Sequence, residues 1–252
     1  MIVVKSAEDL KKMSLACKLS KQVLKYAGTQ INPGMSTFEL DKLIHDYIVA
    51  HGGRPSFLGL YDFPGSACIS LNDEVIHGLP DKKKIIRSGD IVTVDVGACI
   101  GGFHGDNAYT FRVGKVSREA EKLMRVTEEC LNLGIAAARR GNRVGDIGYA
   151  VQMHAEDNGF GVIKEYVGHG VGRDMHEDPQ VPNYGRRGHG VRLVPGMTIA
   201  IEPMITEGSF KVKVLPDGWT VKTEDGKLAA HYENTILITK NGPQILTECE
   251  DF

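Results

Sequence analysis

The sequence predicts a mixed α/β protein built from two similar halves. Stretches with apolar residues at helical spacing alternate with short runs rich in β-branched residues, which is typical of this fold class. A constant offset of 107 residues also aligns residues 88–95 with residues 195–202 without a gap. We therefore expect one domain, residues 1–252, with an internal duplication and halves at about 1–120 and 121–252 that are related by a pseudo-twofold axis.

The composition is that of a globular protein, with 42% hydrophobic and 25% charged residues among 252. A formal net charge of −2 is too small for binding nucleic acid through bulk charge, so we expect no DNA partner. The sequence contains no run of 18 apolar residues, and acidic residues stand near its start where a signal peptide would be basic. We expect a cytoplasmic protein that makes no membrane contact.

Four helices and four longer strands follow from the local patterns. The second helix begins at the capping-box pattern Ser36-Thr-Phe-Glu39 and ends before Gly52. Its counterpart in the second half ends at Gly159. The predicted helices cover residues 11–26, about 36–51, 118–139 and about 144–158, and the predicted strands cover residues 91–96, 108–113, 198–201 and 232–239.

Two aspartates flank a glycine-rich segment that lies between the predicted strands 91–96 and 108–113. A turn near Ile100-Gly101 would pair residues whose numbers sum to about 201, which places Asp95 directly opposite Asp106. Like charges in that arrangement are destabilising unless a shared proton or a bound cation neutralises them. An exposed hairpin that binds nothing explains this pair equally well at this point.

The second half adds further candidate ligands. Glu202 occupies the duplicated position of Asp95, at the end of an apolar run where a lone carboxylate is costly to bury. Glu233 lies inside another aliphatic strand, and His169 stands between glycines that allow close backbone approach. Four carboxylates and one imidazole suit a pair of first-row divalent ions better than a structural thiolate zinc.

Other catalytic signatures and a disulfide framework are not predicted. Gln180 occupies the place of the second histidine that a zinc-binding HExxH helix would need after His176-Glu177. We find no nucleophile-elbow, P-loop or dinucleotide-binding motif. The five cysteines form no CxxC pair, which argues against disulfides and against a cysteine zinc site; they are Cys17, Cys68, Cys99, Cys130 and Cys249.

The motifs together resemble the type I methionine aminopeptidases. They are Asp95 with Asp106 eleven residues later, the segment from Gly168 to Pro179, Ile201-Glu-Pro203 and Tyr232-Glu-Asn-Thr235. The resemblance covers nearly the whole chain and is closest to the short bacterial form. It implies the pita-bread α/β fold, in which two pseudo-twofold-related halves enclose a dinuclear metal site.

The resemblance also assigns roles to residues. It implies that two divalent ions (Co, Mn, Fe or Zn) are held by Asp95, Asp106, His169, Glu202 and Glu233, with a monovalent cation near Asn72. It implies that a metal-activated water attacks the scissile carbonyl with Glu202 as the general base, while His77 and His176 contact the substrate. The methionine pocket would be formed by Phe57, Leu60, Phe63, Cys68, Met175 and Trp219.

Several of these positions depart from the family pattern. Phe57 stands where the family usually has Cys, Leu60 where it has Tyr, and Met175 where it has Phe. The pocket therefore stays apolar, and we expect its shape to differ. Near the expected monovalent-cation site, Ala229 replaces the usual Ser.

The implied activity is removal of the initiator methionine from nascent proteins whose second residue is small. The expected partners are the N-termini of nascent peptides near the ribosome, and the expected state is a monomer. Proline-directed aminopeptidases and prolidases share the fold and ligands, but carry an extra N-terminal domain for which 252 residues leave no room. A non-catalytic binding protein is the other alternative, against which the full ligand set and both histidines argue.

Overall fold

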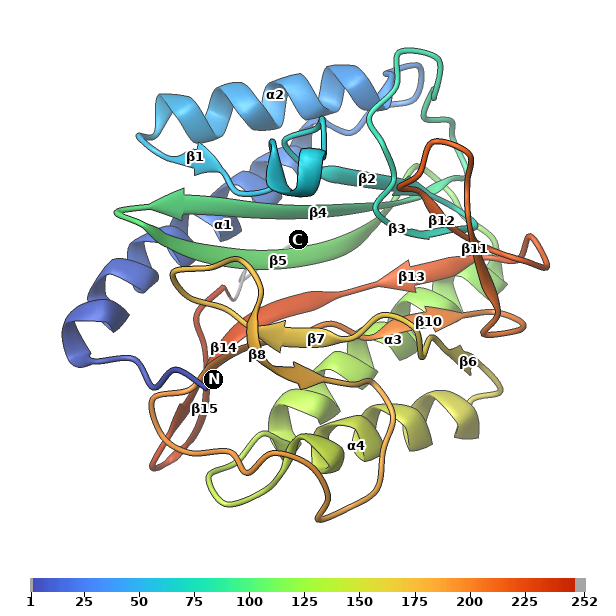
Figure 1. Ribbon diagram of the computed structural model, residues 1–252. Helices are drawn as coiled ribbons and strands as arrows, with labels where there is room; N and C mark the ends of the chain where they lie inside the picture. The colour runs from blue at the N-terminus through green and yellow to red at the C-terminus, as the bar shows by residue number, and fades with distance from the viewer. Residues whose placement is uncertain (1, 248–252) are drawn as a thin grey trace.

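The computed structural model describes residues 2–247 and has a mixed α/β fold (Figure 1). Within these residues nine strands form one antiparallel sheet, in the order β1-β4-β5-β14-β9-β7-β8, with β2 paired to β4 and β15 paired to β14. Its strands are β1 (Arg54–Pro55), β2 (Cys68–Leu71), β4 (Ile91–Ile100), β5 (Phe103–Arg112), β7 (Gly168–Gly170), β8 (Glu177–Val181), β9 (Thr198–Ile201), β14 (Glu233–Thr239) and β15 (Gly242–Ile245).

Helices and two small sheets complete the described part of the chain. The helices are α1 (Ala7–Gln30), α2 (Thr37–Ala50), α3 (Arg118–Ala137) and α4 (Val144–Asp157), with one short 3-10 helix, η1 (Leu60–Asp62). One small sheet joins β6 (Gly161–Val162), β10 (Met204–Thr206) and β13 (Ala229–His231). The other joins β3 (Glu74–Ile76), β11 (Val212–Val214) and β12 (Val221–Thr223).

The four predicted helices are confirmed, although α1 is longer than expected at both ends. The α1 N-cap is Ser6, whose side chain accepts from the backbone N–H of Asp9 while Asp9 bonds back to Ser6. This capping box starts the helix one turn before its apolar pattern begins. The capping box predicted for α2 is present between Ser36 and Glu39.

The hairpin of β4 and β5 is confirmed, but the predicted register was wrong by two residues. Its turn consists of Gly101 and Gly102, which have φ of 59° and 78°, so Ile100 pairs with Phe103. Two positive φ values are what a tight two-residue hairpin turn requires. Asp95 consequently lies opposite Ala108 and diagonal to Asp106. Because side chains alternate every two residues, both aspartates still point to the same face.

The helices cover one face of the sheet in two pairs. Helix α1 packs on β4 and β5, α2 packs on α1 and β1, and α3 and α4 lie along β14, β9 and β8 (Figure 1). Alternate β4 residues such as Val92, Val94 and Val96 are fully buried in the core under α1 and α2. The residues between them, Asp95 included, therefore face away from the helices.

Equivalent elements of the two halves recur at the interval seen in the sequence. Helices α2 and α4 have the same length and begin at residues 37 and 144, which differ by 107. Two isolated backbone bridges, Ser36 with Ile85 and Arg143 with Arg192, differ by the same number. The aligned Gly34 and Gly141 have φ of 93° and 92°.

Helix α1 lies directly on β5 at Gly105, which predicts a strong substitution effect. A Cβ added at Gly105 would lie 2.5 Å from the Cα of Cys17 and 2.6 Å from its N, and backbone atoms cannot move aside alone. We expect Gly105→Ala to lower the stability by about 1–3 kcal/mol, the usual cost of overpacking. Thermal unfolding measures this, with Gly52→Asn as control, since Gly52 has φ of 77° and open space around it. Equal melting temperatures for Gly105→Ala and wild type would contradict this close packing.

Candidate metal centre

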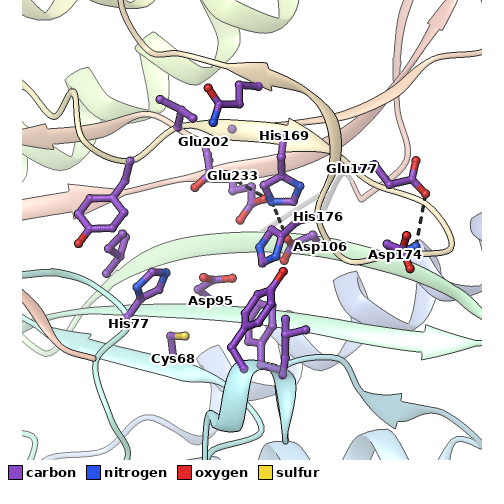
Figure 2. A pocket seen from close by; sticks show the side chains of 18 of the residues that line it. Cys68, His77, Asp95, Asp106, His169, Asp174, His176, Glu177, Glu202 and Glu233 are labelled. Carbon is purple, nitrogen blue, oxygen red and sulfur yellow. Dashed lines mark hydrogen bonds and ion pairs between the residues drawn. The ribbon is translucent and has the colours of Figure 1, made fainter. Parts of the chain in front are cut away.

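Five neighbouring strands each bring one polar side chain to the same cleft. Asp95 lies on β4, Asp106 on β5 and His169 on β7. Glu233 begins β14, and Glu202 directly follows β9. Because β4, β5, β14, β9 and β7 are consecutive in the sheet, all five predicted ligand residues converge on one region (Figure 2).

The distances between these side chains suit coordination of an ion. Ligand atoms of Asp106, His169 and Glu233 all lie within 4.8 Å of one another. The Nε2 atom of His169 is 3.5 Å from Oδ2 of Asp106 and 3.5 Å from Oε1 of Glu202. The Nδ1 of His169 donates to the carbonyl of Gly170 at 2.8 Å, which turns Nε2 toward the carboxylates.

The carboxylates are buried together, at a free-energy cost. Burial and the neighbouring acids hold the pKa values of Asp95 and Glu233 well above their usual range. Burial raises the pKa of Glu202 to about 8, where His169 opposes the rise and Asp106 adds to it. Burial alone would lower the pKa of His169, but its bond to Asp106 and the charges of Glu202 and Asp106 raise it to about 9.

Unpartnered oxygens decide between the two ways of neutralising this charge. Oδ1 of Asp95, Oδ1 of Asp106 and Oε1 of Glu233 are buried without a hydrogen-bond partner. One shared proton can join only two oxygens, whereas a divalent cation can engage oxygens from all three residues. Oxygen-rich sets with one imidazole fit hard and borderline divalent ions. The residues present therefore fit the divalent metal ions that the sequence pattern implies.

Two further histidines line the same cleft. Burial, with the nearby His176, lowers the pKa of His77 to about 4, and burial with the nearby His169 lowers that of His176 to about 4. Each ring is therefore neutral near pH 7 and offers one donor and one acceptor. The backbone of His77 has φ of 56°, an uncommon conformation outside glycine that is concentrated at functional sites.

An apolar pocket adjoins the carboxylates within a cleft of about 820 Å³. All six residues predicted for a methionine pocket lie in one apolar cluster, and Phe63 meets Trp219 edge to face at 5.1 Å. Met175 is only 3% exposed and belongs to this cluster, and the other five residues line the cleft. Burial and Asp95 hold the pKa of Cys68 well above its usual range, so its thiol is a neutral part of the wall. The six are Phe57, Leu60, Phe63, Cys68, Met175 and Trp219.

Sequence reasoning missed His231, Tyr166 and Tyr61. His231 is 1% exposed, both its ring nitrogens lack partners, and Nε2 lies 3.7 Å from Oε2 of Glu202 and 4.0 Å from Oε2 of Glu233. Its position two residues before Glu233 is a signal that could have found it. Tyr61 and Tyr166 line the cleft, and Tyr61 stacks on His176 with ring centroids 6.0 Å apart. Neither tyrosine belongs to a local motif.

The remaining sequence predictions concern the cation near Asn72 and the cysteines. The carbonyl of Asn72 accepts from the N–H of Ala229 at 2.9 Å, so these two residues are neighbours. Cys17, Cys68, Cys99 and Cys130 are buried and free, while Cys249 lies outside the described residues. Between residues 2 and 247, the helices are too short or too polar to cross a membrane.

Comparison with known proteins places this geometry in a family. Residues 11–240 match metallopeptidase family M24. The chain belongs to that family. It is 51% identical over 247 residues to the methionine aminopeptidase of Clostridium perfringens, covering 98% of this chain and 99% of the relative. It is 46% identical to methionine aminopeptidase 1 of Bacillus subtilis, with coverage of 98% and 99%.

Solved structures of similar proteins share the fold. The methionine aminopeptidase of Thermotoga maritima superposes with a TM-score of 0.97 at 45% identity, covering 99% of this chain and all of the other. The prolidase of Pyrococcus furiosus has a TM-score of 0.80 at 23% identity, and the match covers 66% of that chain. The expected pita-bread fold is thus confirmed, and at this lower identity the prolidase shares the fold alone.

The repulsion among the carboxylates predicts opposite effects on stability and metal binding. Glu233→Gln removes one buried carboxyl group, whose ionisation burial and the neighbouring acids oppose, and keeps the shape, so we expect it to raise the melting temperature of the chelator-treated protein. The same change should abolish the stabilisation that Mn²⁺ gives the wild type. In wild type, free Mn²⁺ at 100 times its Kd raises the free energy of unfolding by about 2.7 kcal/mol. Calorimetry with and without Mn²⁺ measures both effects, and the exposed Glu224→Gln is the control. A variant that loses stability and still responds to Mn²⁺ would remove Glu233 from the metal site.

Proposed function

We propose that this chain is a metal-dependent aminopeptidase that removes the initiator methionine from nascent proteins whose second residue is small. The observation that carries the proposal is the convergence of five ligand-type side chains beside an apolar pocket in one cleft. Membership of family M24 and relatives named methionine aminopeptidase at 46–51% identity support it.

We assign the metal site to the side chains that converge from five strands. Two divalent ions, Co, Mn, Fe or Zn, would be held by Asp95, Asp106, His169, Glu202 and Glu233, and the backbone near Asn72 would take a monovalent cation. When bound, a divalent pair lowers the pKa of water and polarises a scissile carbonyl.

Three residues of the chain would handle protons and charge during hydrolysis. The Glu202 carboxylate faces the cleft, where it can accept the proton of the attacking water and later pass it to the leaving amine. The neutral ring of His176 can donate its N–H to the oxygen that becomes negative as the carbonyl is attacked. His77 lines the cleft as well and would contact the substrate backbone.

The apolar cluster would hold the methionine side chain of the substrate. Aromatic rings of Phe57, Phe63 and Trp219 and the thioether of Met175 suit the soft, flexible substrate thioether. Leu60 has no hydroxyl group, so selection in this pocket would depend on shape and dispersion. One methylene of misfit in such a pocket costs about 1–3 kcal/mol.

The setting of this activity is part of the proposal. We propose one catalytic domain with an internal duplication, working as a monomer in the cytoplasm. Its substrates would be N-termini of nascent peptides near the ribosome. The recurrence of elements at 107 residues and the near-neutral charge of −2 are consistent with this setting.

The activity is tested directly with peptides and metals. We expect Met-Gly-Met-Met to lose its first residue only when divalent metal is supplied or retained, because no serine or threonine is among the residues that line the cleft and burial keeps the Cys68 thiol neutral. A chelator should abolish turnover, and Mn, Fe or Co should restore it. Mass spectrometry measures the products, and Xaa-Pro dipeptides should be tested as substrates in parallel. Hydrolysis of these dipeptides in place of Met-Gly-Met-Met would favour a prolidase. Full turnover by metal-free protein would refute a metal-dependent mechanism.

The role of His176 predicts a loss of rate rather than of binding. His176→Ala should lower kcat by about 10²–10³-fold if the ring donates to the developing oxyanion. Steady-state kinetics separate this from a change in KM alone, which would assign the ring to ground-state binding. His189→Ala, at an exposed site away from the cleft, is the matched control and should keep wild-type kinetics.

The altered pocket predicts a particular selectivity. We expect methionine and norleucine to be removed at similar rates, and leucine or phenylalanine at least about 10-fold more slowly, since those side chains misfit the slot. Phe57→Cys should change kcat/KM for methionine without changing metal content. The measurement is kcat/KM over peptides X-Gly-Met-Met that differ only in X. If leucine matches methionine at X, the assignment of the substrate is wrong.

A further inference from the structure

A buried ion pair outside the metal centre joins the N-terminal segment to the cleft. The side chains of Lys5 and Glu177 contact each other and are 2% and 8% exposed, although 172 residues separate them. Desolvating two charges makes such a pair weak evidence for stability, because apolar residues of similar size often do as well. Neither residue takes part in the hydrolysis proposed above, so the pair calls for another explanation.

Both partners are fixed to the surrounding backbone. The N–H of Lys5 donates to the carbonyl of Gly196 at 2.9 Å. One carboxylate oxygen of Glu177 binds Lys5, and the other accepts the N–H groups of Arg173 at 2.8 Å and Asp174 at 3.3 Å. The ion pair therefore holds the turn before Glu177 against the start of the chain.

This turn, residues 171–177, carries two groups of the proposed active site. Met175 is part of the apolar pocket, and His176 lines the cleft with its ring 4.5 Å from that of His169 (Figure 2). The ion pair packs directly on this turn, because a Cβ added at Gly172 would meet Oε1 of Glu177 and lie 2.5 Å from Cε of Lys5. A shift of Glu177 would thus move the adjacent His176.

We infer that the Lys5–Glu177 ion pair positions His176 and Met175 for the reaction. Lys5 and Glu177 are positioning residues that act through the turn; Glu177 also lines the cleft, and its carboxylate is occupied by Lys5 and by the N–H groups of Arg173 and Asp174. The inference rests on the proposed function for its kinetic test. A misplacement of about 1 Å in a reacting group can cost about 10²-fold in rate, even when its cause lies at a distance.

The first test is Lys5→Met, which keeps the length of the side chain and removes its charge. We expect kcat for Met-Gly-Met-Met to fall by at least about 10-fold, with Mn²⁺ affinity by calorimetry unchanged within about 2-fold. Lys42→Met, the same change at an exposed pair with Asp46, is the control and should keep wild-type kcat. A variant that only melts earlier and keeps wild-type kcat well below its melting temperature would overturn the inference.

The second test asks whether Lys5 acts through His176. In a His176→Ala background, Lys5→Met should lower kcat by no more than about 2-fold, because the group it positions is gone. A full additional loss in that background would overturn the inference. If Lys5→Met does not fold, Lys5→Met with Glu177→Gln removes both charges and avoids an unpaired buried one. Wild-type kcat in that double variant would also overturn it.

A third measurement separates this inference from the proposed function. Ring ¹⁵N chemical shifts of His176, assigned by comparison with His176→Ala, report its surroundings in chelator-treated protein without any turnover. We expect them to differ between wild type and Lys5→Met and to match between wild type and Lys42→Met. Identical shifts in all three would overturn the positioning role even if the chain had no peptidase activity, whereas an inactive wild type with shifted signals would count only against the proposed function.

Discussion

Buried carboxylates that repel one another share one face of the sheet, and both the packing of the opposite face and metal binding are linked to that repulsion. Asp95, Asp106, Glu202 and Glu233 bring negative charge into a region where three of their oxygens have no hydrogen-bond partner. The opposite face compensates, because the helix pairs bury alternate aliphatic residues such as Val92 and Val94. A sheet that alternates in this way can hold a charged face only while its other face is well packed, so metal binding and folding are thermodynamically linked.

The sequence predicted the members of the charged face better than their arrangement. Alternation along a strand is a local property, so the shared face of Asp95 and Asp106 survived a register error of two residues. The turn at Gly101-Gly102 sets the register, because both glycines adopt positive φ. Glycine can adopt positive φ but also adopts negative φ, so the sequence alone does not place the turn. The order of the strands in the sheet is not a local property either. Periodicity does not predict it, and the expected fold came from the family resemblance.

Two of the contacts that the sequence does not reveal join residues distant along the chain, whereas His231 lies only two residues from Glu233. Lys5 meets Glu177 across 172 residues, and Tyr61 of η1 stacks on His176. Periodicity and capping patterns describe neighbours within a few turns or strands, so they carry no information on such contacts. The N-terminal extension of α1 is different, because Ser6 and Asp9 form a capping box that was readable in the sequence and was overlooked.

The ligand-type residues and the residues that would contact the substrate are held in place by different parts of the fold. This difference explains how specificity can vary while the metal site is kept. The ligand-type residues lie on or next to paired strands, whose backbone bonds fix them. His77, Met175 and His176 lie on connecting segments and Tyr61 lies in the short helix η1. Tyr61 and His77 have positive φ, and Met175 and His176 lie on a turn that one ion pair restrains. Connecting segments tolerate substitution better than paired strands do. Phe57 and Met175, the positions where we expect departures from the family pattern, can therefore vary while the five ligand-type residues remain in place.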